Sequence, residues 1–179
     1  MLKKVVLFAS AGLFAAVATA CSAPTAAAPT TATDPVSIAP SPAASADLLA
    51  LLKECPNEGQ KGRIQQTFTQ DVTGDGTPET LVARTCEAST SYIPSTVEVF
   101  QGTKRIGTLM EEAGPTDLPW FVSLTAAGTE VTVTANGVAE DGTQACPELE
   151  ITYRYAYADG AFKRTAREAT TASDCLPVG

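Results

Sequence analysis

The chain has 179 residues, with 20 acidic and 12 basic side chains, and its formal net charge is −8 at pH 7. This acidic balance excludes a nucleic-acid-binding role, because such proteins need a basic face to meet phosphates. The sequence contains no His, which excludes Ser-His-Asp and Cys-His catalysis as well as zinc sites built on imidazole.

Residues 1–20 have the pattern of a secretory signal peptide. Lys3 and Lys4 precede the apolar run VVLFASAGLFAAV, which is shorter than the roughly 20 residues that a membrane-spanning helix needs. Small residues then lead to Cys21 in the sequence ATACS, as at a signal cleavage site. We expect residues 1–20 to be removed on export.

The residues around Cys21 resemble the lipobox of bacterial lipoproteins, although Ala18 stands where that motif usually has Leu. The resemblance implies cleavage before Cys21 and a diacylglyceryl group, with palmitate-type chains, on its sulfur. Plain secretion after cleavage of the same bond is the alternative. The chain has five Cys, and lipidation of Cys21 leaves an even number for disulfides in an exported domain. We therefore expect a lipid-anchored protein at the extracytoplasmic face of the cell membrane.

The segment that begins with the lipidated Cys, residues 21–45, is predicted to be a tether. It is rich in Ala, Thr, Ser and Pro, and Asp34 is its one charged residue. Such a composition buries too little apolar surface to fold and favours an extended spacer. Residues 46–179 then form one extracellular domain of ordinary size. Because this domain is acidic, we expect it to contact the membrane through the lipid and not through its own surface.

The predicted fold class of this domain is α+β: a short N-terminal helix packed on a mainly antiparallel β-sheet, braced by two disulfides. A helix is expected over residues 46–54, with Ser45 as its N-cap. Residues at positions i, i+3, i+4 and i+7 give this helix one apolar face. They are Leu48, Leu51, Leu52 and Cys55.

The segment DVTGDGTPE, residues 71–79, has the spacing of a calcium loop. With Asp71 as position 1, oxygen atoms fall at positions 3, 5, 7 and 9, and Gly76 stands at position 6, where the chain must turn sharply. Position 12 is Val82 and strands flank the segment, so it resembles the hairpin loops of FG-GAP and VCBS-type extracellular repeats. That resemblance implies a weak, structural calcium ion. The alternative is a tight loop whose Asp side chains accept hydrogen bonds from backbone N–H groups. The implied ligands are Asp71, Thr73, Asp75, Thr77 and Glu79.

Alternating apolar residues predict strands along the rest of the domain. A hairpin is expected at residues 101–103, and Tyr153, Tyr155 and Tyr157 lie on one face of a long strand, where sheet packing is a better explanation than ligand contact. The strands are expected around residues 64–68, 80–86, 96–100, 105–110, 120–124, 131–135 and 149–157.

The C-terminal hairpin can be registered from Asp159-Gly160, a preferred type I′ turn pair. Tyr157 then faces Phe162, and continuing the ladder outward places Cys146 opposite Ser173. A splay or bulge would bring the sulfur of Cys146 to a second Cys two residues further on. The predicted disulfides are therefore Cys146–Cys175 and, by elimination, Cys55–Cys86.

Residues 114–121 (GPTDLPWF) form the best loop candidate for contact with a partner. Two prolines stiffen the loop, and Trp120 has the size of an interface anchor. Its alternation with Val122 and Leu124 favours a place in the core instead. The carboxylate pairs Glu111-Glu112 and Glu140-Asp141 are adjacent in sequence, which is more typical of a solvated loop than of a catalytic pair.

The order of these features resembles small lipoproteins of high-GC Gram-positive bacteria, of the LppP/LprE type. The residues that carry the resemblance are Cys21, the tether, and the segments 71–86, 94–109 and 146–162. The resemblance implies an address and a fold but no activity.

The sequence as a whole predicts a binding or scaffolding domain at the cell envelope and not an enzyme. Its ligand or partner, a protein or another envelope component, is not encoded in any motif. Two alternatives stay open: an inhibitor-like domain that offers a disulfide-braced surface to a protein, and a carboxylate-dependent hydrolase of envelope polymers.

Overall fold

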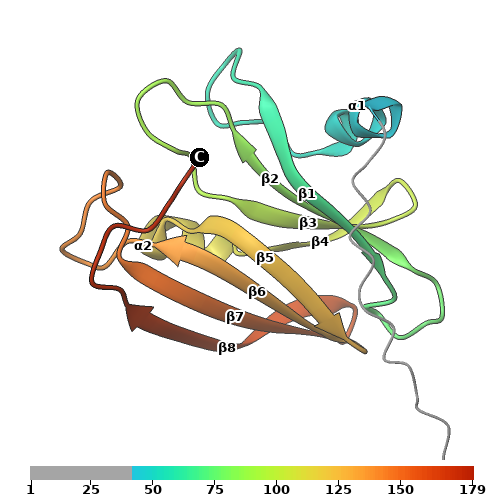
Figure 1. Cartoon of the computed structure of the whole chain (residues 1–179). Coiled ribbons are helices and arrows are strands. Elements are labelled where there is room, and N and C mark those ends of the chain that lie inside the picture. Colours follow the sequence, from blue (N-terminus) through green and yellow to red (C-terminus); the bar gives the residue numbers. More distant parts are fainter. Residues whose placement is uncertain (1–41) are drawn as a thin grey trace, which may run out of the picture. The chain divides into compact units, whose positions relative to one another are not determined.

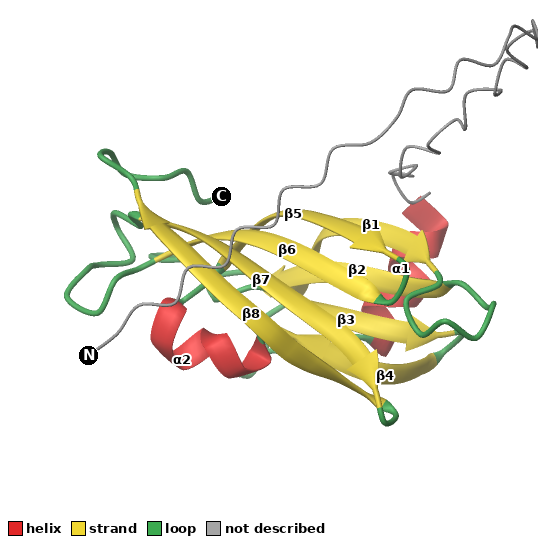
Figure 2. Cartoon of the chain, turned by 90° about the horizontal axis from the view of Figure 1, so that it is seen from below, coloured by secondary structure: helices red, strands yellow, loops and turns green. Residues whose placement is uncertain are grey.

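The computed structural model describes residues 42–179, with side chains from Asp47 onward. The predicted signal peptide, the lipidation site Cys21 and most of the predicted tether lie outside the described residues. Residues 42–179 form two four-stranded antiparallel sheets, in the orders β1-β2-β3-β4 and β5-β6-β7-β8. Figure 1 shows the two sheets stacked on each other, and Figure 2 shows the second sheet in front of the first. The first sheet contains β1 (Gly62–Gln70), β2 (Glu79–Cys86), β3 (Thr96–Gln101) and β4 (Lys104–Leu109). The second contains β5 (Trp120–Ala127), β6 (Glu130–Gly137), β7 (Leu149–Ala158) and β8 (Ala161–Thr171).

The prediction of an antiparallel fold with two disulfides is confirmed, but the prediction of a single sheet is wrong. The chain leaves β4 through a 3-10 helix, η1 (Glu111–Ala113), and a single-turn helix, α2 (Gly114–Asp117). This crossover carries β5 into a second layer, so that β5 pairs with β6 and not with β4. Two separate sheets can bury their apolar faces against each other, which a single sheet covered by one short helix could not do.

The core lies between the two sheets and takes residues from both of them. Leu81, Val97 and Val99 come from the first sheet, and Val133 and Ile151 come from the second. The predicted tyrosine face of β7 is confirmed as a packing face: Tyr153 and Tyr155 are buried in the core, and Tyr157 packs on Phe162 with ring centroids 4.9 Å apart. Aromatic pairs at this distance add to the stability that burial provides.

The N-terminal helix α1 (Pro42–Leu51) begins and ends earlier than predicted, and none of its residues from Asp47 onward belongs to the core cluster. Residues 42–45, predicted as the end of the tether, belong to this helix. Leu48, Leu51 and Leu52 are half-buried, so the predicted apolar face is only partly covered. The helix lies beside β1, and just after the helix the Lys53 N–H donates to the Glu98 carboxylate on the outer face of the first sheet. No helix among residues 42–179 is long and apolar enough to cross a membrane.

A register shift in β5 decides where the single tryptophan of the chain lies. The ladder between β5 and β6 slips between Phe121 and Ser123, so that two consecutive side chains, Trp120 and Phe121, are buried while Val122 is 47 % exposed. Phe121 joins Leu124 in the core cluster, and Trp120 does not. The predicted alternation of Trp120 with Val122 and Leu124 is therefore wrong, because a β-bulge reverses the facing of the residues before it.

The disulfides of the structure are the two pairs that the sequence predicts, Cys55–Cys86 and Cys146–Cys175. Tyr157 pairs with Phe162 across the final hairpin, as expected, and a bulge between Arg154 and Tyr155 shifts the ladder by one residue. The ladder ends at Leu149 and Thr171, after which the two chain segments are joined by Cys146–Cys175. Each disulfide closes a loop of about 30 residues, which in the chain-entropy model contributes roughly 2–4 kcal/mol.

Candidate functional site

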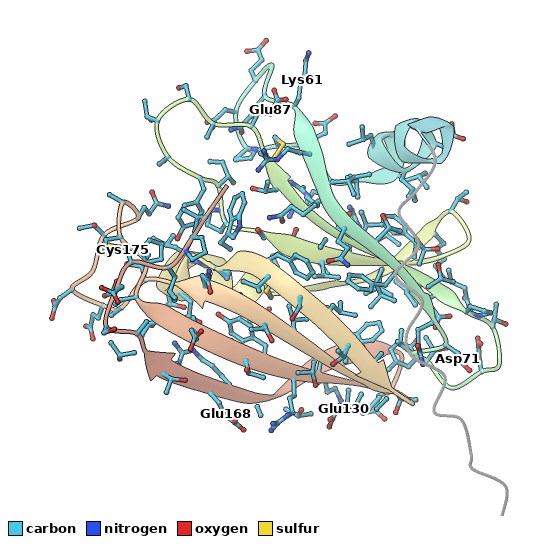
Figure 3. The ribbon with its side chains drawn as sticks, viewed as in Figure 1. Lys61, Asp71, Glu87, Glu130, Glu168 and Cys175 are labelled. Atoms are coloured by element: carbon cyan, nitrogen blue, oxygen red, sulfur yellow. A yellow bond between two sulfur atoms is a disulfide. The ribbon has the colours of Figure 1, made fainter. Side chains whose placement is uncertain are left out.

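A pocket of about 1180 Å³ lies at the end of the first sheet where β1 begins and β2 ends. Figure 3 places Lys61 and Glu87 at this end and Asp71 at the opposite end of the same two strands. Segments far apart in the sequence form the pocket: residues 57–60 after α1, residues 86–93 after β2, residues 144–145, and residues 178–179. Trp120 and Arg63 complete the lining. The volume is close to that of the clefts in which proteins bind small ligands, roughly 300–1,000 Å³.

Two aromatic rings and one guanidinium group that line the pocket contact one another. Trp120 and Tyr92 meet edge to face, with ring centroids 5.5 Å apart. The Tyr92 hydroxyl donates to the Leu118 carbonyl at 2.7 Å. Burial of Tyr92, and to a lesser degree the Glu148 carboxylate, raises the pKa of Tyr92 to about 12. Tyr92 therefore stays neutral and holds Trp120 against the loop that precedes it.

Arg63 lies over the Trp120 ring, with its guanidinium carbon 5.6 Å from the ring centroid. A guanidinium group in this position is attracted by the negative face of the ring, and its hydrogen-bond donors at the edge stay available. Every other arginine of residues 42–179 forms an ion pair with a carboxylate. Among residues 42–179, Arg63 is therefore the one arginine without a carboxylate partner. Arg63 lines the pocket.

The walls of the pocket carry groups that both donate and accept hydrogen bonds. Ser89, Thr90 and Ser91 supply hydroxyls, and the side chains of Glu58 and Glu87 supply carboxylates at exposed positions. Serine and threonine hydroxyls act as donors and acceptors, whereas ionised carboxylates only accept. A ligand that fits these walls needs hydrogen-bond donors for the carboxylates, in addition to the group that accepts hydrogen bonds from Arg63.

The wall formed by residues 57–60 is fixed to β2 in three ways. The Cys55–Cys86 disulfide joins the two segments covalently. The Gln60 side-chain amide donates to the Glu87 carbonyl, and the Glu87 N–H donates to the Lys61 carbonyl at 2.9 Å. The pocket wall is therefore held in place without a ligand, which lowers the entropic cost of binding.

The predicted calcium loop lies at the far end of the hairpin from the pocket, and its carboxylates accept backbone hydrogen bonds. Asp71 accepts from the N–H groups of Gly74 and Gly76 at 2.7 and 2.9 Å. Buried Glu79 accepts from the N–H groups of Val72 and Thr73. This is the geometry of the alternative that the sequence left open. Each carboxylate offers about four lone-pair sites, so the hydrogen bonds leave acceptor capacity on Asp71.

The other two predicted ligands stand at the tip of the same loop. The hydrogen bond from the Thr77 N–H to Asp75, at 2.7 Å, is the main cause of a lowered pKa for Asp75. Asp75 also accepts from the Gln101 amide at 2.8 Å. Among residues 42–179, no group of three or more His, Cys, Asp and Glu side chains is placed to hold a metal ion. A site that uses threonine and carbonyl oxygens is not tested by that finding, and calcium binding stays a prediction.

Calcium at about 10 mM is expected to raise the melting temperature of the protein by a few degrees. With a dissociation constant of about 10⁻³ M, typical of extracellular modules, one bound ion shifts the folding equilibrium about tenfold. The measurement is thermal unfolding with calcium and with chelator. Asp71→Asn should abolish the shift, and Asp141→Asn, in a different exposed loop, should keep it. An identical melting temperature with calcium and with chelator would contradict the prediction.

Of the adjacent carboxylate pairs that the sequence singled out, Glu111 and Glu112 contact basic or tyrosine side chains. Glu111 pairs with Lys53. Glu112 accepts a hydrogen bond from the Tyr155 hydroxyl at 3.0 Å and lies 3.5 Å from Arg164. The contacts of Glu112 connect the crossover after β4 to the second sheet, so the structure gives Glu112 a place in the packing of the crossover.

Sequence reasoning found Trp120 but missed Arg63 and Tyr92. Arg63 reads as one exposed residue of a strand, and Tyr92 stands in a polar loop. The alternation signal of β5 pointed to the core for Trp120, and only the bulge moves it to the pocket. No family model, curated protein or solved structure matches the chain.

Proposed function

We propose that the chain is a lipid-anchored binding protein of the cell envelope, and that its pocket binds a polar ligand that carries an anionic group. The anchor is the diacylglyceryl group expected on Cys21, and the tether between Cys21 and the start of α1 at Pro42 sets the distance of the domain from the membrane. The observation that carries the binding role is Arg63, stacked on Trp120 in the pocket and without a carboxylate partner among residues 42–179.

The anionic group of the ligand follows from the chemistry of Arg63. A guanidinium group presents parallel N–H donors that match a carboxylate or a phosphate. The domain is rich in carboxylates, and each of the other arginines of the described residues forms an ion pair with one of them. An arginine that escapes such pairing, and that an aromatic ring holds in one orientation, is suited to an anion from outside the chain.

The rest of the ligand follows from the walls. Glu58 and Glu87 would repel a ligand made only of anionic groups, so the ligand must also present hydroxyl, amide or ammonium donors. Fragments of cell-wall glycopeptide combine a carboxylate with such donors, and they occur where a lipid-anchored domain would be located. The ligand class that fits best is therefore an acidic glycan or glycopeptide fragment.

The single tryptophan of the chain gives a direct test, because its fluorescence reports the occupancy of the pocket. The probes are three soluble envelope fragments: muropeptides, uronic-acid oligosaccharides and glycerol phosphate oligomers. We expect at least one of them to change the Trp120 emission with saturation. Arg63→Ala should weaken that binding at least tenfold, because a hydrogen-bonded charge contributes about 1.5–3 kcal/mol.

Lys104→Ala is the matched control, because Lys104 is an exposed cation in the β3–β4 hairpin, outside the pocket. It removes the same charge from the domain and should leave the affinity unchanged. The proposal is overturned if none of the three probes changes the emission, or if the two variants bind a probe with equal affinity.

The lipid anchor has its own test, because Cys21 lies outside the described residues. Cells that express the full chain are labelled with a palmitate analogue, and the label is expected on the wild-type protein. Cys21→Ala should lose the label and leave the membrane fraction for the medium. A variant that keeps the label, or a wild-type protein that never acquires it, would contradict the anchor.

A further inference from the structure

The guanidinium group of Arg84 contacts the sulfur atoms of the Cys55–Cys86 disulfide. Its Nη1 lies 2.9 Å from Cys86 Sγ and 3.9 Å from Cys55 Sγ. Arg84 and Cys86 are two residues apart on β2, and alternation places both on the outer face of the first sheet. The cation therefore adjoins one of the two sulfurs much more closely than the other.

The other donors of Arg84 are occupied, so the orientation of its Nη1 is fixed. Arg84 Nε donates to Glu98 Oε1 at 3.0 Å, and Nη2 donates to the Lys53 carbonyl at 2.6 Å. Arg84 is nearly fully buried, which weakens the screening of its charge by water. The guanidinium group is in this way held against Cys86 by contacts that do not involve the disulfide.

The charges around the disulfide leave one positive charge uncompensated. Glu98 is the shared partner of two arginines, Arg84 and Arg105, and its carboxylate is 0 % exposed. Two guanidinium groups face one carboxylate, so the cluster has a net charge of about +1. A thiolate on Cys86 would be the second anion that neutralises this cluster.

We propose that the Cys55–Cys86 disulfide is a thiol–disulfide exchange site, in which Cys55 is the sulfur attacked and Cys86 is the leaving group. Cys55 is partly exposed, whereas Cys86 is only 3 % exposed, so an incoming thiolate reaches Cys55. This proposal is independent of the ligand proposed for the pocket.

The exchange is balanced with a small or protein-borne dithiol as the reductant. Its first thiolate forms a bond to Cys55 Sγ as the Cys55–Cys86 bond breaks, and the electron pair passes to Cys86 Sγ, where Arg84 stabilises the thiolate. The second thiolate of the reductant then attacks the reductant's first sulfur, which is bonded to Cys55 in the mixed disulfide, and releases the Cys55 thiolate. Two thiolates of the chain take up protons from the oxidised dithiol or the solvent, and the reductant leaves as a disulfide. A leaving thiol stabilised as thiolate departs faster and makes the disulfide easier to reduce.

The chain contains its own reference for this effect in the second disulfide. Cys146–Cys175 also closes a loop of about 30 residues, so the chain-entropy contribution of the two disulfides is similar. Among the described residues, no arginine donates a hydrogen bond to Cys146 or Cys175. A difference between the two disulfides in their equilibrium constants for reduction is therefore caused by the surroundings of the sulfur atoms and not by the loop length.

The test equilibrates the full exported chain in dithiothreitol buffers of graded redox potential, traps free thiols by alkylation, and maps them by mass spectrometry. Cys55 and Cys86 are expected to be alkylated in buffers in which Cys146 and Cys175 are still paired. The equilibrium constants for reduction should differ at least tenfold, which corresponds to about 30 mV for a two-electron couple. With glutathione as the thiol, the mixed disulfide should form on Cys55 and not on Cys86.

Two variants separate the role of Arg84 from simple exposure. Arg84→Gln should lower the ratio of the two equilibrium constants for reduction at least tenfold. Arg154→Gln, on the second sheet, should leave this ratio unchanged. If Arg84→Gln does not fold, the order of reduction and the position of the glutathione adduct in the wild-type chain decide the question. The proposal is overturned by reduction of both disulfides together, by reduction of Cys146–Cys175 first, by an adduct on Cys86, or by a difference that persists in Arg84→Gln.

Discussion

Replacement of Glu98 by Gln is expected to lower the free energy of unfolding by about 3–5 kcal/mol, because it removes one partner of a buried ion pair. Glu98 accepts hydrogen bonds from Arg84 at 3.0 Å, from Arg105 at 2.8 Å and from the Lys53 N–H at 3.0 Å. Gln has one acceptor oxygen and no charge, so the buried Arg84 would lose its counter-ion. Typical domains have a total stability of about 5–15 kcal/mol, so this loss is a large part of the whole.

The measurement is urea denaturation of Glu98→Gln and of wild type, with both disulfides intact. Arg105→Gln is the matched control, because it removes a second partner of the same carboxylate at a position that is 39 % exposed. Glu98 then keeps Arg84, and the expected cost is no more than about 2 kcal/mol. Equal costs for the two variants, or a cost below about 1 kcal/mol for Glu98→Gln, would show that the cluster does not hold the segment after α1 to the sheet.

The strands and the final hairpin could be predicted because their signals are local. Alternation over a few residues indicates a strand, and Asp159-Gly160 fixes the pairing of Tyr157 with Phe162. The disulfide pairs followed from this register and from elimination. The strand and hairpin predictions need only residues that are neighbours in sequence or across one turn, and the disulfide pairs add to them only the extension of one ladder and the count of the remaining cysteines.

The layers and the pocket could not be predicted because they depend on contacts between distant segments. Nothing in the sequence of residues 110–119 shows that the chain changes sheets there. The bulge after Phe121 depends on the pairing of β5 with β6, and it alone decides whether Trp120 faces the core or the pocket. Arg63 becomes distinctive only when the ion pairs of the other arginines are known.

Buried charges have one structural role in common in this fold. Glu98, with Arg84, holds the segment after α1 to the outer face of the first sheet. Asp117 lies on α2 in the crossover between the sheets and contacts two strands of the second sheet, through Tyr153 and Arg167. In both places an irregular segment with few apolar side chains is fixed to a sheet by a carboxylate. Sequence patterns based on apolar periodicity do not detect such contacts.

Asp117→Asn is therefore expected to lower the free energy of unfolding at pH 7 by about 3 kcal/mol, since the bond broken is a nearly buried ion pair. Arg167 donates to Asp117 through Nε at 2.9 Å and Nη2 at 2.8 Å, and the Tyr153 hydroxyl donates at 2.6 Å. Glu168→Gln is the matched control on the same strand, because Glu168 pairs with Arg154 at an exposed position and should cost less than about 1 kcal/mol.

The pH dependence of this difference identifies the charge of Asp117 as its cause. Burial alone would raise the pKa of Asp117, but hydrogen bonds from Arg167 and Tyr153 outweigh burial and hold the pKa below its ordinary value of 3.8. A carboxyl whose folded-state pKa is lowered contributes stability that is complete above this ordinary, unfolded-state pKa and is lost as the pH falls through the folded-state value. The stability difference between wild type and Asp117→Asn should therefore be constant from about pH 7 to pH 5 and shrink below about pH 4. Urea denaturation at each pH measures the difference in free energy of unfolding between wild type and Asp117→Asn. If this difference stays constant or grows in acid, the lost charge of Asp117 is not the cause of the destabilisation.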